Sequence, residues 1–419
     1  MTHPNHTTKT LVLAAAAGLT ATTAPTLAEV PTYQVEVIET FTTTTTVMGA
    51  GENGHVVGWQ GVGGFVTPFV ATRADGIQAL PLPAGYNSGT AMDVNASGEI
   101  VGAVDDAGFP FDDGEPAIWT PDGAGGYTVV IPDQFQQLDS PLGPLGADGG
   151  MAVAINDSGT ILGWSRFQGF QGGPTTRFFK TGAPVNLGDE GFSGTVRDLN
   201  NNGVAVGNTI VFDLNTMTAT DIGLPDPTQP GNVGFTNAVA YAINDNGELV
   251  VTANTAGVPT ENWLTYTYTD AGGYERLNPS QIPTRFVGDV YDNNNLGDVS
   301  ADGGIYFAAE DTLVSSYDSL LDPADADWDT SIGYIDNDRR VLTTADNAAT
   351  GQSAIVMLVP DAGSCAGDLS GNGSVGFEDL NLFTAAFQTG DPAADLNGDG
   401  SVGFEDLNTF VAAFAAGCP

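Results

Sequence analysis

The chain has 419 residues, of which 41% are hydrophobic and 9% aromatic, so it can bury a core and is not a disordered acidic chain. Its 51 acidic side chains face only 10 basic ones, and the formal net charge of −41 makes nucleic acid and anionic membrane surfaces poor partners. The 56 glycines favour a β architecture with many tight turns over a helical one.

Residues 1–28 have the features of a secretory signal peptide. A polar stretch ending at Lys9 precedes a small apolar run at 11–19, and the segment finishes at Ala28. That run is too short to cross a bilayer, and we expect no membrane-spanning segment later in the chain. The expected product is secreted or cell-surface, cleaved near Ala28. His55 is then the only histidine left, which argues against histidine catalysis and multi-histidine metal sites.

One short pattern recurs through residues 29–360: an apolar residue, Asn or Asp, two small polar residues, Gly, a variable residue and an apolar pair that often ends in Gly. The seven copies are centred on Gly54, Gly98, Gly159, Gly203, Gly247, Gly297 and Arg339. Those centred on Gly54, Gly297 and Arg339 are the weaker copies. The chain therefore contains seven units of about 44 residues.

Each copy predicts a hairpin turn, because Asn and Asp close local side-chain-to-backbone bonds and Gly takes positive φ. Short apolar strands flank the turn. A third strand is expected at 117–120, 176–180 and 262–266, and a fourth at 77–81 and 127–132. Four short antiparallel strands in a repeat of about 40 to 50 residues are typical of a propeller blade.

The two ends of the repeat region predict closure into a ring. Residues 33–38 resemble a fourth strand with no blade before it, and the last unit ends after a third strand at 354–358. We expect the N-terminal strand to complete the last blade, because an open array would expose its edges. The predicted fold is mainly β, with a seven-bladed β-propeller-like repeat domain over residues 29–360. Another β-repeat array or a different blade count is the alternative.

The apolar-Asn-x-x-Gly-x-apolar-apolar-Gly core, as in 94–102 and 155–163, resembles the bacterial extracellular repeats of the HAF family. The resemblance covers roughly residues 45–350 and depends on short degenerate copies. It implies export, and it adds no catalytic residue.

The end of the chain contains a tandem duplication: segment 368–387 returns as 395–414, offset by 27 residues, with sixteen of twenty positions identical. Each copy opens with a twelve-residue loop of the EF-hand type, in which positions 1, 3, 5, 7, 9 and 12 supply oxygen ligands and Gly stands at position 6. The expected ligands of the first loop are Asp368, Ser370, Asn372, the carbonyl of Ser374 and Asp379. The expected ligands of the second loop are Asp395, Asn397, Asp399, the carbonyl of Ser401 and Asp406. We therefore predict two Ca²⁺ sites, with a water at position 9, where both loops have Gly.

The second loop offers three ligand carboxylates and the first offers two. Because ligand charge tunes calcium affinity, the second site is expected to bind more tightly.

Apolar residues at helical spacing follow each loop and predict two short amphipathic helices. They are Phe377, Leu380, Phe383 and Phe387 after the first loop, and Phe404, Leu407, Phe410 and Phe414 after the second. We expect the first phenylalanine of each set to lie in the core of the module and not to face a partner.

Two cysteines, Cys365 and Cys418, bracket this module. In an exported protein that placement predicts one disulfide closing the module. A metal-binding role is not favoured, because no other soft ligand lies nearby in the sequence. Residues 361–364 are the expected linker, and 365–419 form the small α-helical, calcium-binding domain.

Two loops, each followed by a helix and neither preceded by a full one, resemble a type I dockerin over residues 365–419. The terminal Gly417-Cys418 is similar to the variant that ends many exported bacterial proteins. The resemblance implies calcium at the ligands given above and a cohesin-like or envelope protein as partner. Phe377-Glu378 and Phe404-Glu405 depart from it, because well-studied dockerins have a small hydroxylated pair there to meet the cohesin.

These patterns favour an exported, calcium-binding, non-enzymatic protein. Its propeller would present a surface to an extracellular glycan, an envelope component or a protein, and its tail would tether or cap the propeller. The alternative is a propeller-fold polysaccharide lyase or glycosidase that uses paired carboxylates. The sequence contains no nucleophile motif, phosphate loop or histidine cluster, so we predict no catalytic residues.

Overall fold

The computed structural model describes residues 30–360 and parts of the tail. In the first region the gaps are 107–113, 133–136, 141–142, 168–175, 181–184, 189, 193–194, 227, 229–234, 256–262, 278–289, 302–303, 315 and 332. In the tail the described residues are 369, 375, 377–389, 392–394, 396 and 402–416.

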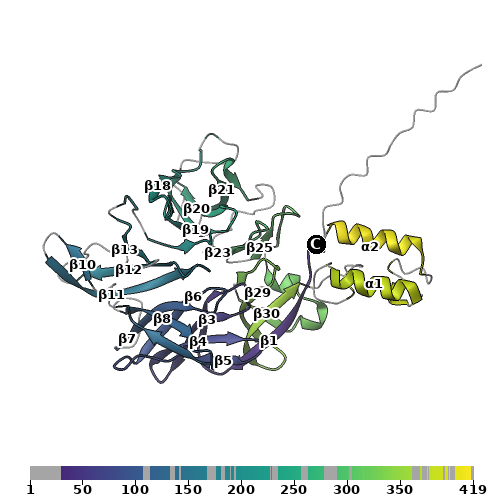
Figure 1. Cartoon of the computed structure of the whole chain (residues 1–419), viewed down its shortest axis with the longest axis horizontal. Coiled ribbons are helices and arrows are strands. Elements are labelled where there is room, and N and C mark those ends of the chain that lie inside the picture. The colour runs from purple at the N-terminus through teal and green to yellow at the C-terminus, as the bar shows by residue number, and fades with distance from the viewer. Residues whose placement is uncertain are drawn as a thin grey trace, which may run out of the picture.

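The described strands form seven antiparallel sheets in a propeller arrangement, here numbered 1 to 7 in chain order (Figure 1). Sheet 1 contains β2 (Thr45–Ala50), β3 (Val56–Val62), β4 (Phe65–Thr72) and β5 (Gly76–Ala79). Sheet 2 contains β6 (Ser88–Val94), β7 (Ile100–Asp105), β8 (Glu115–Pro121) and β9 (Tyr127–Val130). Sheet 3 contains β10 (Gln137–Ser140), β11 (Gly143–Ile155), β12 (Ile161–Phe167), β13 (Thr176–Lys180) and β14 (Val185–Asn186).

The remaining sheets repeat this order of strands. Sheet 4 contains β15 (Asp198–Leu199), β16 (Val204–Gly207), β17 (Ile210–Asp213) and β18 (Thr218–Asp221). Sheet 5 contains β19 (Phe235–Ile243), β20 (Leu249–Thr255), β21 (Trp263–Thr269) and β22 (Gly273–Arg276). Sheet 6 contains β23 (Val290–Asn293), β24 (Val299–Ala301), β25 (Gly304–Phe307) and β26 (Thr312–Val314). Sheet 7 contains β27 (Trp328–Thr330), β28 (Tyr334–Ile335), β29 (Val341–Asn347), β30 (Gln352–Pro360) and β1 (Tyr33–Phe41).

The first strand of the chain completes the last sheet. β1 pairs antiparallel with β30 from Tyr33 opposite Pro360 to Phe41 opposite Ser353, and the two run side by side in Figure 1. Short 3₁₀ turns at Tyr317–Leu320 and Pro323–Asp325 lie between sheets 6 and 7. The predicted pairing of the two ends of the repeat domain is confirmed.

Glycine closes many of the repeat copies because the backbone of a neighbouring strand approaches there. A Cβ added at Gly102 would overlap the carbonyl oxygen of Thr90, and one at Gly207 would overlap that of Thr195. Only glycine fits such an approach without displacing the backbone.

Apolar side chains fill the space between successive sheets. Trp119 of β8 is fully buried, packs with Val57 and Val70 of sheet 1, and donates its indole N–H to the Pro81 carbonyl at 2.8 Å. Equivalent clusters join the later sheets, so the core is divided among the junctions between sheets.

The tail contains α1 (Phe377–Thr389), a 3₁₀ turn at Pro392–Ala394 and α2 (Phe404–Ala416). Phe383 and Phe410 stack with their ring centroids 4.5 Å apart and are buried at the centre of a small apolar cluster. Both predicted helices are therefore present.

One tail prediction is wrong: Phe404 is 72% exposed and not part of the core. The helix begins at Phe404, and the interior beside its first turn is occupied by the buried Asp406 carboxylate and by Leu407. The side chain of Phe377 lies outside the described residues.

Within the described part of the chain, no helix combines the length and apolar character needed to cross a bilayer.

Candidate functional site

The turns predicted from the Asn-x-x-Gly pattern meet around a central cavity of about 160 Å³. All seven repeat units supply residues to its wall. The end of the propeller where these turns meet is the first candidate site.

Each turn is built by its own first side chain. In the third unit, Asn156 Oδ1 accepts the backbone N–H of Ser158 at 3.2 Å and of Thr160 at 3.0 Å. Gly159 takes φ of 74°, which reverses the chain without Cβ strain. The predicted hairpin turns are thus confirmed.

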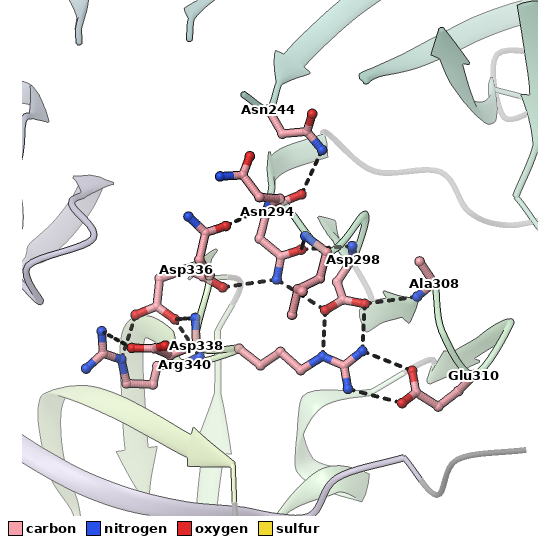
Figure 2. Close-up of polar contacts among 12 residues, drawn as sticks. Asn244, Asn294, Asp298, Ala308, Glu310, Asp336, Asp338 and Arg340 are labelled. Carbon is pink, nitrogen blue, oxygen red and sulfur yellow. Dashed lines mark hydrogen bonds and ion pairs between the residues drawn. The ribbon is translucent and has the colours of Figure 1, made fainter. Parts of the chain in front are cut away.

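The side-chain nitrogen of the turn asparagine forms a hydrogen bond with the next repeat unit. The side-chain N–H of one turn asparagine donates to the carbonyl of the first residue in the next turn. The pairs are Asn95 to Asn156 (3.2 Å), Asn156 to Asn200 (3.1 Å), Asn200 to Asn244 (2.9 Å), Asn244 to Asn294 (2.8 Å) and Asn294 to Asp336 (3.0 Å). Figure 2 shows the links at Asn244 and Asn294. We call this series the asparagine ladder.

A second series of bonds runs beside the asparagine ladder, from the backbone N–H of the second turn residue to the side chain of its counterpart in the next turn. The pairs are Ala96 to Asp157, Asp157 to Asn201, Asn201 to Asp245 and Asp245 to Asn295, each at 2.8 Å, and Asn295 to Asn337 at 2.7 Å. Two hydrogen bonds, one from each series, therefore join the turns of neighbouring units at each of these junctions.

The junction between the last and first units uses charged residues instead of amides. Asp336 has no side-chain N–H to donate, and Arg340 takes over this role by binding Asp336 Oδ2 at 2.6 Å and the Glu52 carbonyl at 3.3 Å. The Asn337 backbone N–H donates to Glu52 Oε2 at 3.1 Å. Asn53 then joins units 1 and 2 by donating to the carbonyls of residues 95 and 96. The series of bonds closes on itself.

A buried ion-pair network locks the sixth unit to the seventh. Arg339 takes the glycine position of its turn at φ of 62° and is 7% exposed. Its guanidinium contacts both oxygens of Asp298, at 2.8 and 3.2 Å, and both oxygens of Glu310, at 3.1 Å. Figure 2 shows these two carboxylates turned toward the same guanidinium, with Asp298 also accepting the Ala308 backbone N–H.

Among the carboxylates that line the central cavity, three lie two residues before a turn asparagine: Asp93, Asp198 and Asp292. Asp93 accepts the N–H of Val94 and of Ile155, both at 2.8 Å, on its two separate oxygens. Asp198 likewise uses both oxygens, for the N–H groups of Leu199 and Ile243. Asp93 and Asp198 each fasten one unit to the next, and both oxygens of each accept an N–H group.

Burial raises the pKa of all three of these carboxyls. The pKa of Asp93 is raised to about 7, chiefly by burial and against the lowering effect of its N–H donors. The pKa of Asp292 is raised well above the usual value by burial and then by the nearby Asp198. Burial also raises the pKa of Asp198. With a pKa of about 7, the Asp93 carboxyl is partly protonated near neutral pH.

The second candidate site is the tail. Of its ten predicted calcium ligands, the structure describes the two at loop position 12, Asp379 and Asp406, which are 0% and 1% exposed. Asp406 accepts the N–H of Leu396 on one oxygen at 2.9 Å and that of Gly403 on the other at 2.7 Å. The last residue of the second loop is thereby drawn back toward its beginning.

The other predicted ligands and both cysteines lie outside the described residues: Asp368, Ser370, Asn372, Ser374, Asp395, Asn397, Asp399, Ser401, Cys365 and Cys418. Among the residues that the structure describes, no three His, Cys, Asp or Glu side chains are grouped so as to hold a metal ion.

Two features of the propeller site were not predicted. Aligning the repeat copies would have placed Asp93, Asp198 and Asp292 at one common position, which is the available signal for a shared role. The partners of Arg339 lie 41 and 29 residues away, and nothing in the local pattern indicates them.

No family model matches the sequence, and no curated protein matches it. Three solved structures with a similar fold illustrate its range. An oligogalacturonate lyase in complex with manganese has a TM-score of 0.42 and 10% identity, covering 79% of this chain and 97% of that one. The protein YCF48 bound to D1 peptide has a TM-score of 0.40 and 15% identity, covering 80% and 99%. A fucose-specific lectin from Aleuria aurantia has a TM-score of 0.33 and 11% identity, covering 78% and 96%. At these values the likenesses concern the fold and support no argument about activity.

Proposed function

We propose that this chain is an exported, calcium-binding protein whose propeller is a rigid, non-catalytic scaffold for a ligand and whose dockerin-like tail tethers or caps it. The observation that supports it most directly is the pair of buried carboxylates Asp379 and Asp406 at the start of the two tail helices. Burying an ionised carboxylate is unfavourable unless hydrogen-bond donors or a cation compensate. Asp406 already accepts the N–H groups of Leu396 and Gly403, and a calcium ion in each loop would add the positive charge that N–H groups do not supply.

The donor set suits calcium, which takes six to eight hard oxygens. The first ion would be held by Asp368, Ser370, Asn372, the Ser374 carbonyl and Asp379. The second would be held by Asp395, Asn397, Asp399, the Ser401 carbonyl and Asp406. When bound, calcium would supply the positive charge that these oxygens lack, and ligation would contribute to the folding of the tail. The Asp406 bonds to the Leu396 and Gly403 N–H groups support this proposal, because they hold position 12 of the second loop near position 2.

For the propeller, we propose seven blades closed by β1. The support is the set of seven sheets, together with the bonds that return from Asn337 and Arg340 to Glu52. So many fixed contacts suit a scaffold that presents a surface without changing shape.

A non-catalytic propeller is favoured by what two of the cavity carboxylates, Asp93 and Asp198, do. Both oxygens of Asp93 and of Asp198 accept backbone N–H groups, so each is engaged in joining two units. A glycosidase or lyase needs carboxylates that reach the substrate. A lyase or glycosidase stays the alternative, and activity would then need other residues.

Titration calorimetry with CaCl₂ on the chelator-treated full-length protein tests the calcium role. We expect two binding events, with the Asp379→Ala and Asp406→Ala variants each losing one. Because the second loop has three ligand carboxylates, Asp406→Ala should remove the tighter event. A larger loss of calcium affinity from Asp379→Ala would refute the predicted order of affinities. Calcium-binding heats that are unchanged in both variants would refute the two sites.

Incubation with acidic and neutral polysaccharides tests the scaffold role. We expect retention of a polysaccharide without release of shorter products. Product release that grows with time and enzyme concentration would instead establish the alternative, a carbohydrate-degrading enzyme.

A further inference from the structure

A second cavity, of about 490 Å³, lies between sheets 1 and 2. Its wall combines the β4–β5 turn of sheet 1 with the turn at 95–98 and the β8–β9 turn of sheet 2. This volume is in the range of small-molecule sites, which are about 300 to 1,000 Å³. None of the asparagines of the ladder and none of the carboxylates of the central cavity is among the residues that line it.

The repeat departs from its own pattern where it faces this cavity. His55 follows the turn glycine of unit 1, a position held by Glu99 in unit 2 and Glu248 in unit 5. Each of those glutamates lies within hydrogen-bond distance of its own turn asparagine. His55 Nδ1 is buried, and within the described residues it has no hydrogen-bond partner. A buried polar atom without a partner is uncommon and here lies in a cavity wall.

Tyr127 faces the same space. A methyl group placed at Gly98 would lie 3.8 Å from the Tyr127 hydroxyl and 3.9 Å from His55 Nε2, so the missing side chain of Gly98 leaves room in front of both. Tyr274 lies on β22, the equivalent strand of unit 5, and its hydroxyl donates to the Gly223 carbonyl at 2.8 Å. Tyr127 makes no such bond among the described residues.

The charges around the cavity select against anions. Asp75 supplies a carboxylate, and no Lys or Arg is among the described residues that line the wall. Burial lowers the pKa of His55 although Asp75 opposes this effect, so the imidazole is neutral near pH 7 and offers one N–H donor and one acceptor. The amide of Gln78 is oriented by its bond to the Gly125 carbonyl at 3.1 Å, which leaves its oxygen as a further acceptor.

We infer that this cavity binds a neutral, polyhydroxylated ligand of the size of one or two sugar units, contacted by His55, Asp75, Gln78 and the ring and hydroxyl of Tyr127. A sugar hydroxyl both donates and accepts, which matches a wall with mixed donors and acceptors. The apolar face of a sugar ring packs on an aromatic side chain, for which Tyr127 and the adjacent Pro121 are available. The inference rests on the ligand-binding role proposed for the propeller and specifies its site.

Saturation-transfer NMR on the full-length, calcium-loaded protein tests the inference, with cellobiose, maltose and lactose as neutral probes and digalacturonate as the acidic comparison. We expect at least one neutral disaccharide to bind and digalacturonate not to bind. Tyr127→Ala and His55→Ala should weaken binding at least about tenfold. Tyr127→Phe should weaken it about three- to tenfold, the loss of one hydrogen bond, with an unchanged melting temperature.

Tyr274→Phe is the matched control, because it loses the bond to Gly223 and should lower the melting temperature without changing the affinity. Absence of binding by all three neutral probes would overturn the inference. Binding that survives both Tyr127→Ala and His55→Ala would overturn this site as well, while leaving the ligand-binding role intact. A calcium titration of the same samples reports on the tail separately, so the two proposals can fail independently.

Discussion

The propeller and the tail treat buried oxygen atoms in different ways. In the propeller, oxygens of Asp93, Asp198 and the turn asparagines accept N–H groups of the chain itself. Among the described residues of the tail, the buried carboxylates Asp379 and Asp406 accompany three buried apolar side chains, Phe383, Ala394 and Phe410. The proposed difference is that N–H groups alone order the oxygens of the propeller, whereas those of the tail would also bind a cation. The four predictions below test this contrast, from the largest expected effect to the smallest.

Removing calcium should give the largest difference between the two regions, because it should destabilise the tail and not the propeller. In excess EDTA we expect the tail to lose its helices, because ligation and folding are coupled. The propeller should melt within about 1 °C of its calcium-loaded value, since a change in its stability would need a change in its contacts. Differential scanning calorimetry of the full chain checks both transitions. The exposed-site variant Asp122→Ala should leave both unchanged, and a propeller transition that moves with the tail would contradict the contrast.

Within the propeller, breaking the Arg339 network should have the largest effect. Arg339→Met leaves Asp298 and Glu310 buried without a positive partner and should lower the free energy of unfolding by about 3 to 5 kcal/mol. Arg73→Met is the matched control, because Arg73 pairs with Glu36 at the surface and should lose less than about 1 kcal/mol. Urea titration of both variants measures the difference. Equal losses would show that the buried network contributes no more than a surface pair.

Interrupting the asparagine ladder should have an intermediate effect. Asn200→Ala removes the acceptor of the Val204 N–H and leaves the Asn244 carbonyl with the Gly247 N–H alone, and it should lower the free energy of unfolding by about 2 kcal/mol. Asn87→Ala, which removes an exposed bond to the Asp106 carbonyl, should change it by less than about 0.5 kcal/mol. If urea titration gives the two variants the same stability, the ladder does not hold the units together.

Measured per pH unit, the smallest effect is the pH dependence from the central cavity. Burial raises the pKa of Asp93 from 3.8 to about 7 in the folded state, so the folded state binds more protons than the unfolded state between these values. This contribution is fully present below about pH 4 and is lost as the pH rises through about 7. Asp93→Asn should therefore flatten the fall in stability between pH 4 and 7 by about 1 kcal/mol per pH unit.

Asp122→Asn is the control for this measurement, because backbone N–H groups lower the pKa of the exposed Asp122 and confine its contribution to more acidic pH. Melting curves at closely spaced pH values provide the comparison. A slope that is steeper in Asp93→Asn than in the unmodified chain would contradict the assignment.

Local patterns predicted the local structure well. Asn, Gly and the apolar pair identified the turns, and the third and fourth strands fall where alternation and turn residues placed them. The unpaired strand at 33–38 also predicted the pairing of β1 with β30. The turns and strands depend on residues close together in the chain, and the pairing of β1 followed from a strand that had no blade of its own. Both kinds of information can be read from the sequence.

Contacts between units were not predictable in the same way. Asn200 and Asn244 are 44 residues apart. Nothing in the sequence around a turn asparagine indicates that its side-chain nitrogen donates to a carbonyl of another unit. Phe404 was misplaced because helical spacing alone does not tell a first-turn residue from an inward-facing one. His55 was dismissed as a lone histidine, yet its departure from the Glu99 and Glu248 positions was visible in the aligned repeats.

Hydrogen exchange of backbone amides, with and without calcium, tests the central contrast most directly. In the full chain, the amides of α1 and α2 should be protected with millimolar calcium and should exchange rapidly with EDTA, while those of β29 and β30 exchange equally slowly in both. Protection of α1 and α2 that is the same with chelator as with calcium would contradict the account.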